Sequence, residues 1–268
     1  MITSFAAEPE ELLSPGFRGR PCIGRLTGTS AQVWQIPLRA PDRVLERMHA
    51  LLAPDEQRRM TRLRFSHHRA RFLLARGALR LLLGAYLDMP ADQLVFRYAR
   101  HGKPGLSGGP DPQGLEFNLS HSHELCACAF SRARPLGIDI EYRYRSVNVA
   151  GLSRRLFSAT EIAELERTPP ALRTHAFLNG WTRKEAVLKA TGEGLTGSLR
   201  RVGVSLAPDK PARFQAPGPA GWRLEALELG SDYVGALALA PPHRDGPRDA
   251  LDINRDCAGL GAWAVPQP

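Results

Sequence analysis

Hydrophobic and polar positions along the chain follow two cycles, each with helical spacing first and strand alternation second. In the first cycle, apolar residues at helical spacing predict a long helix over residues 66–87. Proline starts and acidic first turns predict shorter helices over residues 41–53 and 54–64. Alternating segments bounded by Gly and Pro predict strands over residues 31–38, 94–98, 115–119, 125–130 and 136–142.

The second cycle begins at Ser158-Ala-Thr-Glu161, where Ser and Glu have the spacing of a capping box. We expect one helix from there to about residue 166 and a longer one over residues 171–190. The strands that follow are expected over residues 202–206, 222–228 and 233–240. Helices followed by strands, twice over, predict an α+β protein of two related halves, although no sequence repeat is visible.

The division between the halves is expected near residue 135. We therefore predict an N-terminal half over residues 1–134 and a C-terminal half over residues 135–240. Residues 241–268, with their prolines and charges, are expected to form a flexible tail. The first 30 residues are rich in Gly and Pro and predict no clear element.

Composition narrows the class of protein. The chain has 268 residues, 43% of them hydrophobic, which is enough for one large domain or two small ones with a substantial core. Its net charge of +9 indicates an acidic partner: nucleic acid, an anionic lipid surface, an acidic protein or a phosphorylated small molecule. No apolar run has the length of a membrane span, and residues 1–13 lack the basic start of a secretory signal. We expect a cytoplasmic protein.

Two carboxylates lie on one predicted strand, in the segment G-I-D-I-E. Because side chains alternate along a strand, Asp139 and Glu141 share one face, about 7 Å apart, while the two isoleucines face a core. Mg²⁺ is commonly held by one or two carboxylates together with substrate phosphates. The alternative is a half-exposed strand with an acidic face.

A third acid falls inside the long helix of the second cycle, in W-T-R-K-E-A-V-L-K. Glu185 lies at the edge of the apolar stripe, and Lys189 follows one turn later. An ordinary Glu-to-Lys pair on a surface helix would explain this spacing. The edge position favours instead a metal ligand or a general base.

Three other patterns in the sequence resemble binding sites, but their context disfavours that interpretation. The G-x-G-x-x-G over residues 192–197 ends a helix, whereas a dinucleotide fingerprint follows a strand, so it indicates a helix stop. A zinc cluster of His121, His123, Cys126 and Cys128 is disfavoured because a strand would tie both cysteines to its alternation. An arginine-rich face over residues 58–80 could bind nucleic acid, but it lacks interleaved aromatic residues.

The ordered motifs resemble those of the 4′-phosphopantetheinyl transferases, in particular the larger, two-halves type that activates nonribosomal peptide and polyketide synthases. The resemblance covers about residues 50–205 and extends weakly to residue 240. It implies two α+β halves related by a pseudo-twofold axis, with the active site between them. The motifs are G-K-P from Gly102, F-N-L-S-H-S from Phe117, G-I-D-I-E from Gly137, F-S-x-T-E from Phe157 and W-x-x-K-E-A-x-x-K from Trp181.

The resemblance also implies a reaction: the phosphopantetheine arm of coenzyme A passes to a serine of an apo carrier protein, and 3′,5′-ADP leaves. By this similarity Asp139, Glu141 and Glu185 hold Mg²⁺, with Mn²⁺ as a possible substitute. Glu185 is the expected base, directly or through a metal-bound water, and Lys189 is expected at the α-phosphate or leaving oxygen. Lys103, Ser120 and His121 are expected to hold the phosphates of coenzyme A, and Arg71 to contact the nucleotide.

The expected partners are therefore acyl or peptidyl carrier domains and coenzyme A, with neither nucleic acid nor membrane. A monomer is expected, because the two halves supply both sides of the site. The alternative is another Mg²⁺-dependent enzyme that transfers phosphoryl groups or cleaves phosphodiesters, which would share the three acids but has no need of the G-K-P and S-H-S segments.

Overall fold

The computed structural model describes residues 1–20, 23, 26–99, 102–107, 114–192, 199–215 and 219–241. Apart from its first residue, the predicted tail lies outside these ranges, as do residues 193–197 of the G-x-G-x-x-G segment. The first part of the chain contains the elements β1 Ile2–Ala6, α1 Pro9–Leu12, η1 Phe17–Gly19, β2 Ala31–Pro37, α2 Asp42–His49, α3 Pro54–Thr61, α4 Ser66–Leu87, η3 Ala91–Gln93, β3 Phe96–Tyr98, β4 Pro104–Leu106, β5 Leu115–Ser122 and β6 Leu125–Arg132.

The second part of the chain repeats the mixture of helices and strands. Its elements are β7 Leu136–Tyr142, α5 Val149–Leu156, α6 Ala159–Arg167, η4 Pro170–Leu172, α7 Arg173–Thr191, η5 Leu199–Arg201, β8 Arg223–Ala226 and β9 Tyr233–Leu239. The predicted helix over residues 66–87 and the predicted strand over 136–142 are confirmed at both ends. The capping box is also confirmed, because Ser158 and Glu161 exchange hydrogen bonds at the start of α6.

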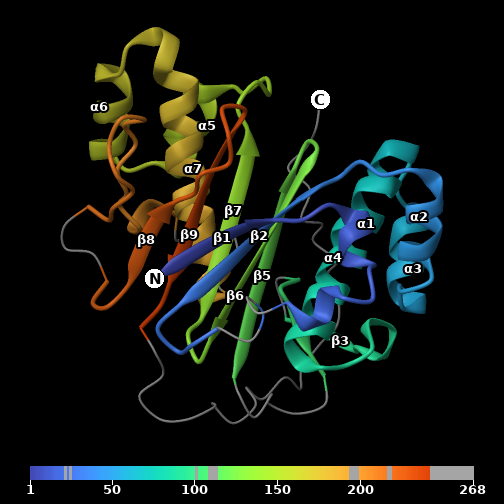
Figure 1. Ribbon diagram of the computed structural model, residues 1–268. Coiled ribbons are helices and arrows are strands. Elements are labelled where there is room, and N and C mark those ends of the chain that lie inside the picture. The colour runs from blue at the N-terminus through green and yellow to red at the C-terminus, as the bar shows by residue number, and fades with distance from the viewer. Residues whose placement is uncertain are drawn as a thin grey trace.

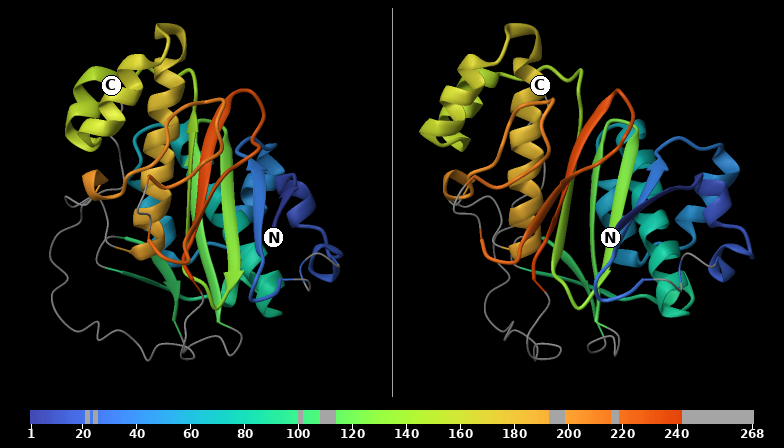
Figure 2. Two further views of the ribbon diagram at one scale, coloured as in Figure 1. Left: turned by 90° about the vertical axis from the view of Figure 1, so that its left-hand side faces the viewer. Right: turned by 60° about the vertical axis from the view of Figure 1, so that its left-hand side comes forward.

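Two larger sheets form the centre of the molecule, and the helices cover their outer sides. One sheet has the strand order β1-β2-β6-β5 and the other β7-β9-β8, while β3 and β4 form a separate hairpin. Figures 1 and 2 show α1 to α4 on one side of the strands and α5 to α7 on the other. The structure is thus α+β, as the sequence predicts.

The two sheets meet across a core of small and branched side chains. Alanines of β2 and β6 pack against isoleucines of β7 and leucines of β9 in one buried cluster. Separate clusters fill the space between α4 and the first sheet and between α7 and the second. Small residues on the first sheet allow the strands of the two halves to approach closely, so the halves form one continuous interior.

The predicted strand over residues 202–206 is wrong. An isolated bridge joins Val204 to Phe214, and two backbone N–H groups of this segment bond to carboxylates of α6. Glu161 accepts from Val204 N, and Glu164 accepts from Leu206 N. Side chains of a helix therefore satisfy donors that a neighbouring strand would otherwise have taken.

The N-terminal segment forms strand β1, which the sequence analysis did not predict. Strand β1 pairs in parallel with β2 and forms one edge of the first sheet. This segment joins the sheet through its pairing with β2, because its own residues alternate poorly between buried and exposed positions.

The arginine-rich helix α4 is less solvated than its sequence indicates. Arg76 and Arg80 are buried and both pair with the buried Glu56. Both guanidinium groups also lie over the ring of Phe96. These two residues therefore do not contribute to an exposed arginine-rich face, because an acid from α3 and an aromatic ring from β3 cover them.

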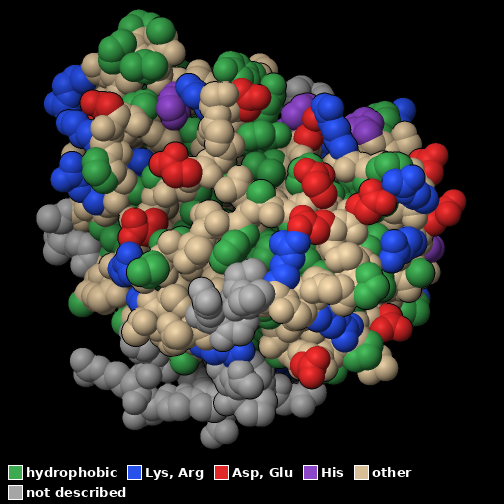
Figure 3. Space-filling model, in the orientation of Figure 1, with side chains coloured by type: hydrophobic (Ala, Val, Ile, Leu, Met, Phe, Trp, Pro, Cys, Tyr) green, Lys and Arg blue, Asp and Glu red, His purple; other side chains and the backbone are tan. Residues whose placement is uncertain are grey.

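Charge on the viewed surface is mixed. Figure 3 shows acidic and basic side chains interspersed over this face, with Lys and Arg gathered at the upper left edge, over α5 and α6. Within the described residues, no helix is long and apolar enough to cross a membrane.

Candidate active site

Strand β7 carries the predicted metal ligands Asp139 and Glu141. One of its edges pairs with β9, and side chains instead of a strand cover the other edge, which faces β5. Three alternate residues of β5 accept from its backbone: Asn118 from Ile138 N, Ser120 from Ile140 N and Ser122 from Tyr142 N. Two lysines donate to its carbonyl groups, Lys103 to Leu136 O and Lys189 to Ile138 O. These polar groups replace a missing strand neighbour and set the register of β7 against β5.

Asn118 and Ser122 were given no binding role by sequence reasoning, yet they hold the carboxylate strand in place. The signal was available in the alternation N-x-S-x-S, which puts three short polar side chains on one face of β5. The alternation does not show which strand these side chains face. That strand, β7, is known only from the way the two halves pack.

The predicted ligands Asp139 and Glu185 come together beneath this edge. Asp139 Oδ1 accepts from Lys189 Nζ at 2.7 Å and from Ser120 Oγ at 2.9 Å. Asp139 Oδ2 and Glu185 Oε1 are buried and have no hydrogen-bond partner among the described residues. Two carboxylate oxygens thus lie inside the protein without a donor, which is costly unless a proton or a cation satisfies them.

The electrostatics of the two acids reflect this arrangement. The pKa of Glu185 is raised to about 8, first by burial and then by the negative charge of Asp139. The pKa of Asp139 is also raised, mainly by burial, although Lys189 opposes the shift. At neutral pH and without a cation, Glu185 therefore carries a proton.

Glu141 lies on the same strand with both oxygens engaged. Its Oε2 accepts from Ser122 Oγ at 2.8 Å and its Oε1 from Arg145 Nη1 at 2.5 Å. Arg145 is absent from the residues that the sequence singled out, since it lies in the turn after the strand. It is a partner that only the folded chain reveals.

Gly137 explains how helix α7 comes so close to β7. A Cβ at this position would lie 2.1 Å from Ala186 O and 2.4 Å from Ala190 N, both on α7. The same turns of the helix carry Glu185 and Lys189. The absent side chain therefore sets the separation between the strand acids and the helix residues.

His121 lies at the end of β5 among basic side chains. Part of the residue surface remains exposed, although protein atoms surround much of the ring. Its pKa is lowered to about 4, first by loss of water around the ring and then by positive charge from Lys189, Arg71, Arg59 and His68. A group of cations around a neutral imidazole is suited to a polyanionic ligand.

The remaining predicted residues divide between this group and the junction. Arg71 approaches Glu124 at 3.8 Å, and its side chain is partly accessible. Ser120 is buried and bonded to Asp139 rather than directed to solvent. Lys103 reaches β7 from the segment after the β3–β4 turn, and burial lowers its pKa.

The other lysine of the W-x-x-K-E-A-x-x-K motif has a structural place. Lys184 is fully buried, pairs with Glu161 and donates to the carbonyls of Leu199 and Val202. It therefore anchors the segment after α7 to α6. The helix itself ends at Gly192, whose positive φ of 77° confirms the predicted helix stop.

A divalent cation fits the donors present. Among the described residues, no three His, Cys, Asp or Glu side chains are already arranged as a metal-binding group. The two unpartnered oxygens on Asp139 and Glu185 are nevertheless hard ligands of the kind that Mg²⁺ takes. Glu141 could join them if it left Arg145.

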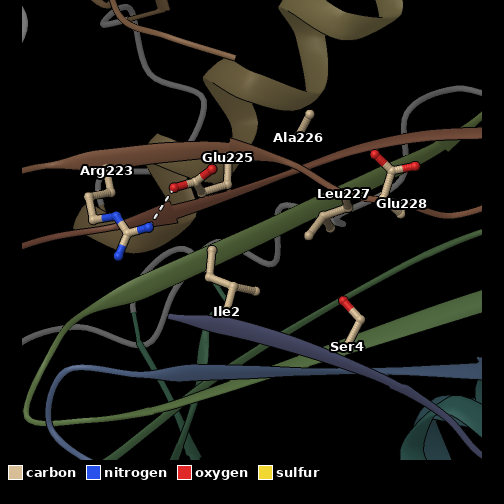
Figure 4. A pocket seen from close by; sticks show the side chains of 7 residues that line it. All are labelled: Ile2, Ser4, Arg223, Glu225, Ala226, Leu227 and Glu228. Carbon is tan, nitrogen blue, oxygen red and sulfur yellow. Dashed lines mark hydrogen bonds and ion pairs between the residues drawn. The ribbon is translucent and has the colours of Figure 1, made fainter. Parts of the chain in front are cut away.

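A cavity of about 280 Å³ lies elsewhere, between β1 and β8 (Figure 4). It contains none of the predicted site residues. Its walls are formed by Ile2, Ser4, Arg223, Glu225, Ala226, Leu227 and Glu228.

Acids from β7 and α7, two lysines and a basic group around His121 meet where the two α+β halves join. This combination is typical of enzymes that transfer phosphoryl groups, because it can balance the charge of a polyphosphate substrate.

Comparison with known proteins identifies the family. Residues 39–132 match the model described as 4′-phosphopantetheinyl transferase, N-terminal, and residues 135–238 match the 4′-phosphopantetheinyl transferase superfamily. The chain is 39% identical over 215 residues to the 4′-phosphopantetheinyl transferase HetI of Nostoc, covering 80% of this chain and 90% of that protein. It is 27% identical over 210 residues to Sfp of Bacillus subtilis, covering 78% and 90%.

The chain therefore belongs to the 4′-phosphopantetheinyl transferase family and is an enzyme that transfers the phosphopantetheine arm of coenzyme A to carrier proteins. The two matched regions correspond to N-terminal and C-terminal domains of the pseudo-dimeric fold, which confirms the predicted class of two α+β halves. The matches also extend the resemblance beyond the residues that carried it in the sequence.

Proposed function

We propose that the transfer depends on Mg²⁺ held by Asp139, Glu141 and Glu185 and releases 3′,5′-ADP. One observation carries the proposal: Asp139 and Glu185 each have a buried oxygen with no partner in the described part of the chain, and Lys189 lies beside them. When bound, the ion would supply positive charge to the pyrophosphate oxygens and the leaving group.

The residues of the chain then have separate tasks. Glu185 would release its proton to solvent when a cation binds beside it, and its carboxylate could then accept the proton of the carrier serine. Lys189 is within reach of the acids and can turn its ammonium to the α-phosphate or leaving oxygen. Ser120 and Ser122 hold Asp139 and Glu141 in place through their hydroxyl groups.

The phosphates of coenzyme A are assigned to the basic group. His121 and Arg71 lie close enough to interact electrostatically, and Lys189 joins them from α7. We assign the 3′-phosphate to His121 and nucleotide contacts to Arg71, with Lys103 and Ser120 assigned to the pyrophosphate. The division of the chain at residue 135, the cytoplasmic location and the monomeric state remain predictions.

The test is direct. The purified protein is incubated with an apo carrier domain, coenzyme A and either Mg²⁺ or EDTA, and the carrier is weighed by mass spectrometry. We expect the mass of the phosphopantetheine arm to appear with Mg²⁺ and to be absent with EDTA. Transfer at the same rate in EDTA would contradict the proposed role of the cation.

Binding of the cation should depend on pH. Because the pKa of Glu185 is raised to about 8, Mg²⁺ must displace a proton below that pH. The apparent affinity is expected to rise by up to about tenfold per pH unit from pH 6 to 8 and to level off above. Calorimetry in buffers of different ionisation enthalpy measures the released proton. An affinity that stayed constant over this range would show that Glu185 does not exchange its proton for the cation.

His121 can be tested with two substrates. If it bonds the 3′-phosphate, His121→Ala should weaken coenzyme A binding about 10- to 150-fold, since a charge-assisted hydrogen bond contributes roughly 1.5–3 kcal/mol. Dephospho-coenzyme A lacks that phosphate, so its KM should change little. The difference between the substrates isolates the contact from general damage to the protein. Equal losses for both would assign His121 a structural role.

A further inference from the structure

The carboxylate oxygens of the three proposed cation ligands differ in their hydrogen-bond partners. Asp139 and Glu185 each have a buried oxygen with no described partner, whereas both oxygens of Glu141 accept hydrogen bonds. One of those donors, Ser122, is neutral and is also one of the three β5 side chains that accept from the backbone of β7. The other, Arg145, carries a full positive charge, so it neutralises a carboxylate that a cation would also use.

Arg145 is placed so that it can leave. It lies in the turn after β7, four residues beyond Glu141, and its side chain is 27% exposed against 10% for Glu141. A partly accessible guanidinium can exchange its carboxylate for water at modest cost, because pairs of this kind contribute little net energy. The buried carboxylate has no such freedom.

We propose that Arg145 and the divalent cation compete for Glu141. The inference rests on the proposed metal site. A guanidinium and Mg²⁺ on one carboxylate would repel each other at close range, so occupation by one disfavours the other. In the protein without cation, Arg145 neutralises Glu141. On binding, Glu141 joins Asp139 and Glu185 as a ligand, and the Arg145 side chain turns to solvent beside the site.

The competition predicts that removal of the arginine strengthens binding. Arg145→Gln should tighten Mn²⁺ binding about threefold to tenfold, the effect expected for loss of one partly shielded competing charge. Free Mn²⁺ is followed by its electron paramagnetic resonance signal, which needs no turnover. Each titration is made with and without coenzyme A, because its phosphates add ligands to the cation.

A matched control is available two residues earlier. Arg143 has the same charge and lies in the same turn, but it donates to Ser231 O and contacts His175 instead of Glu141. Arg143→Gln should leave Mn²⁺ affinity within about twofold of the original, since its charge is farther from the ligands and screened. If both variants bound Mn²⁺ equally more tightly, the cause would be the lower net positive charge of the protein and not the loss of the Arg145–Glu141 pair. That result would overturn the proposal.

A double-mutant cycle completes the test. In the Glu141→Gln background, Arg145→Gln should change Mn²⁺ affinity by less than about twofold, because the contested carboxylate is gone. A tightening that persists there, or unchanged or weaker binding by Arg145→Gln alone, would overturn the competition while leaving the metal site intact. Failure of the unsubstituted protein to bind Mn²⁺ in either condition would overturn the metal site itself. Thermal melting of each variant verifies that it is folded.

Discussion

Glu185→Gln is expected to lower kcat/KM for transfer by about 10²–10⁴, the range that a general base contributes, with further loss from a weakened cation site. The fold should survive, because the pKa of about 8 means that Glu185 is already protonated at neutral pH without a cation. Glutamine reproduces the size and neutrality of that protonated group. Transfer is measured with an apo carrier domain and saturating Mg²⁺, and stability by thermal unfolding without metal.

Glu166 provides the matched control for this substitution. It lies exposed on α6, so Glu166→Gln makes the same chemical substitution at the protein surface. Its transfer rate should remain within about twofold of the original. If Glu185→Gln kept a comparable rate, the glutamate would have no part in the chemistry, and the base would have to be sought among the other groups at the junction.

Gly137→Ala is expected to damage both stability and activity. The new Cβ would lie 2.1 Å from Ala186 O, so β7 and α7 would have to separate. Overpacking of this kind costs about 1–3 kcal/mol of stability. Because Glu185 and Lys189 lie on the displaced turns, kcat/KM should also fall by at least about 100-fold, as small misplacements in a catalytic site do.

The activity loss is measured well below the melting temperature, where the variant is folded, and the cation affinity is measured with it. Gly16→Ala is the control, since a Cβ there would have no atom within 4 Å. Wild-type stability and cation affinity in Gly137→Ala would show that the strand and the helix do not depend on this contact.

Local chemistry in the sequence predicts most elements and the chemical class of the site. The helix over residues 66–87, the strand over 136–142 and the capping box at Ser158 depend on near neighbours in the chain, and all three are confirmed. The motifs likewise indicate the family, which the comparisons establish.

The failures lie where contacts are distant in sequence. Residues 202–206 alternate like a strand, but carboxylates of α6 accept from the backbone N–H groups of Val204 and Leu206. Arg76 and Arg80 belong to the arginine-rich segment over residues 58–80, but Glu56 and Phe96 bury them. In both cases, side chains from another element determine the local hydrogen bonding or burial.

The sequence alone therefore predicts which residues carry the chemistry, because alternation and helical spacing follow from backbone geometry within a few residues. Only the tertiary structure decided how those residues are paired. Asn118, Ser120 and Ser122 meet β7 across the junction of two halves, and Gly137 admits α7 to the same strand. Such contacts depend on complementary shape and burial between distant segments, and that is why Asp139 faces Lys189 while Arg145 engages Glu141.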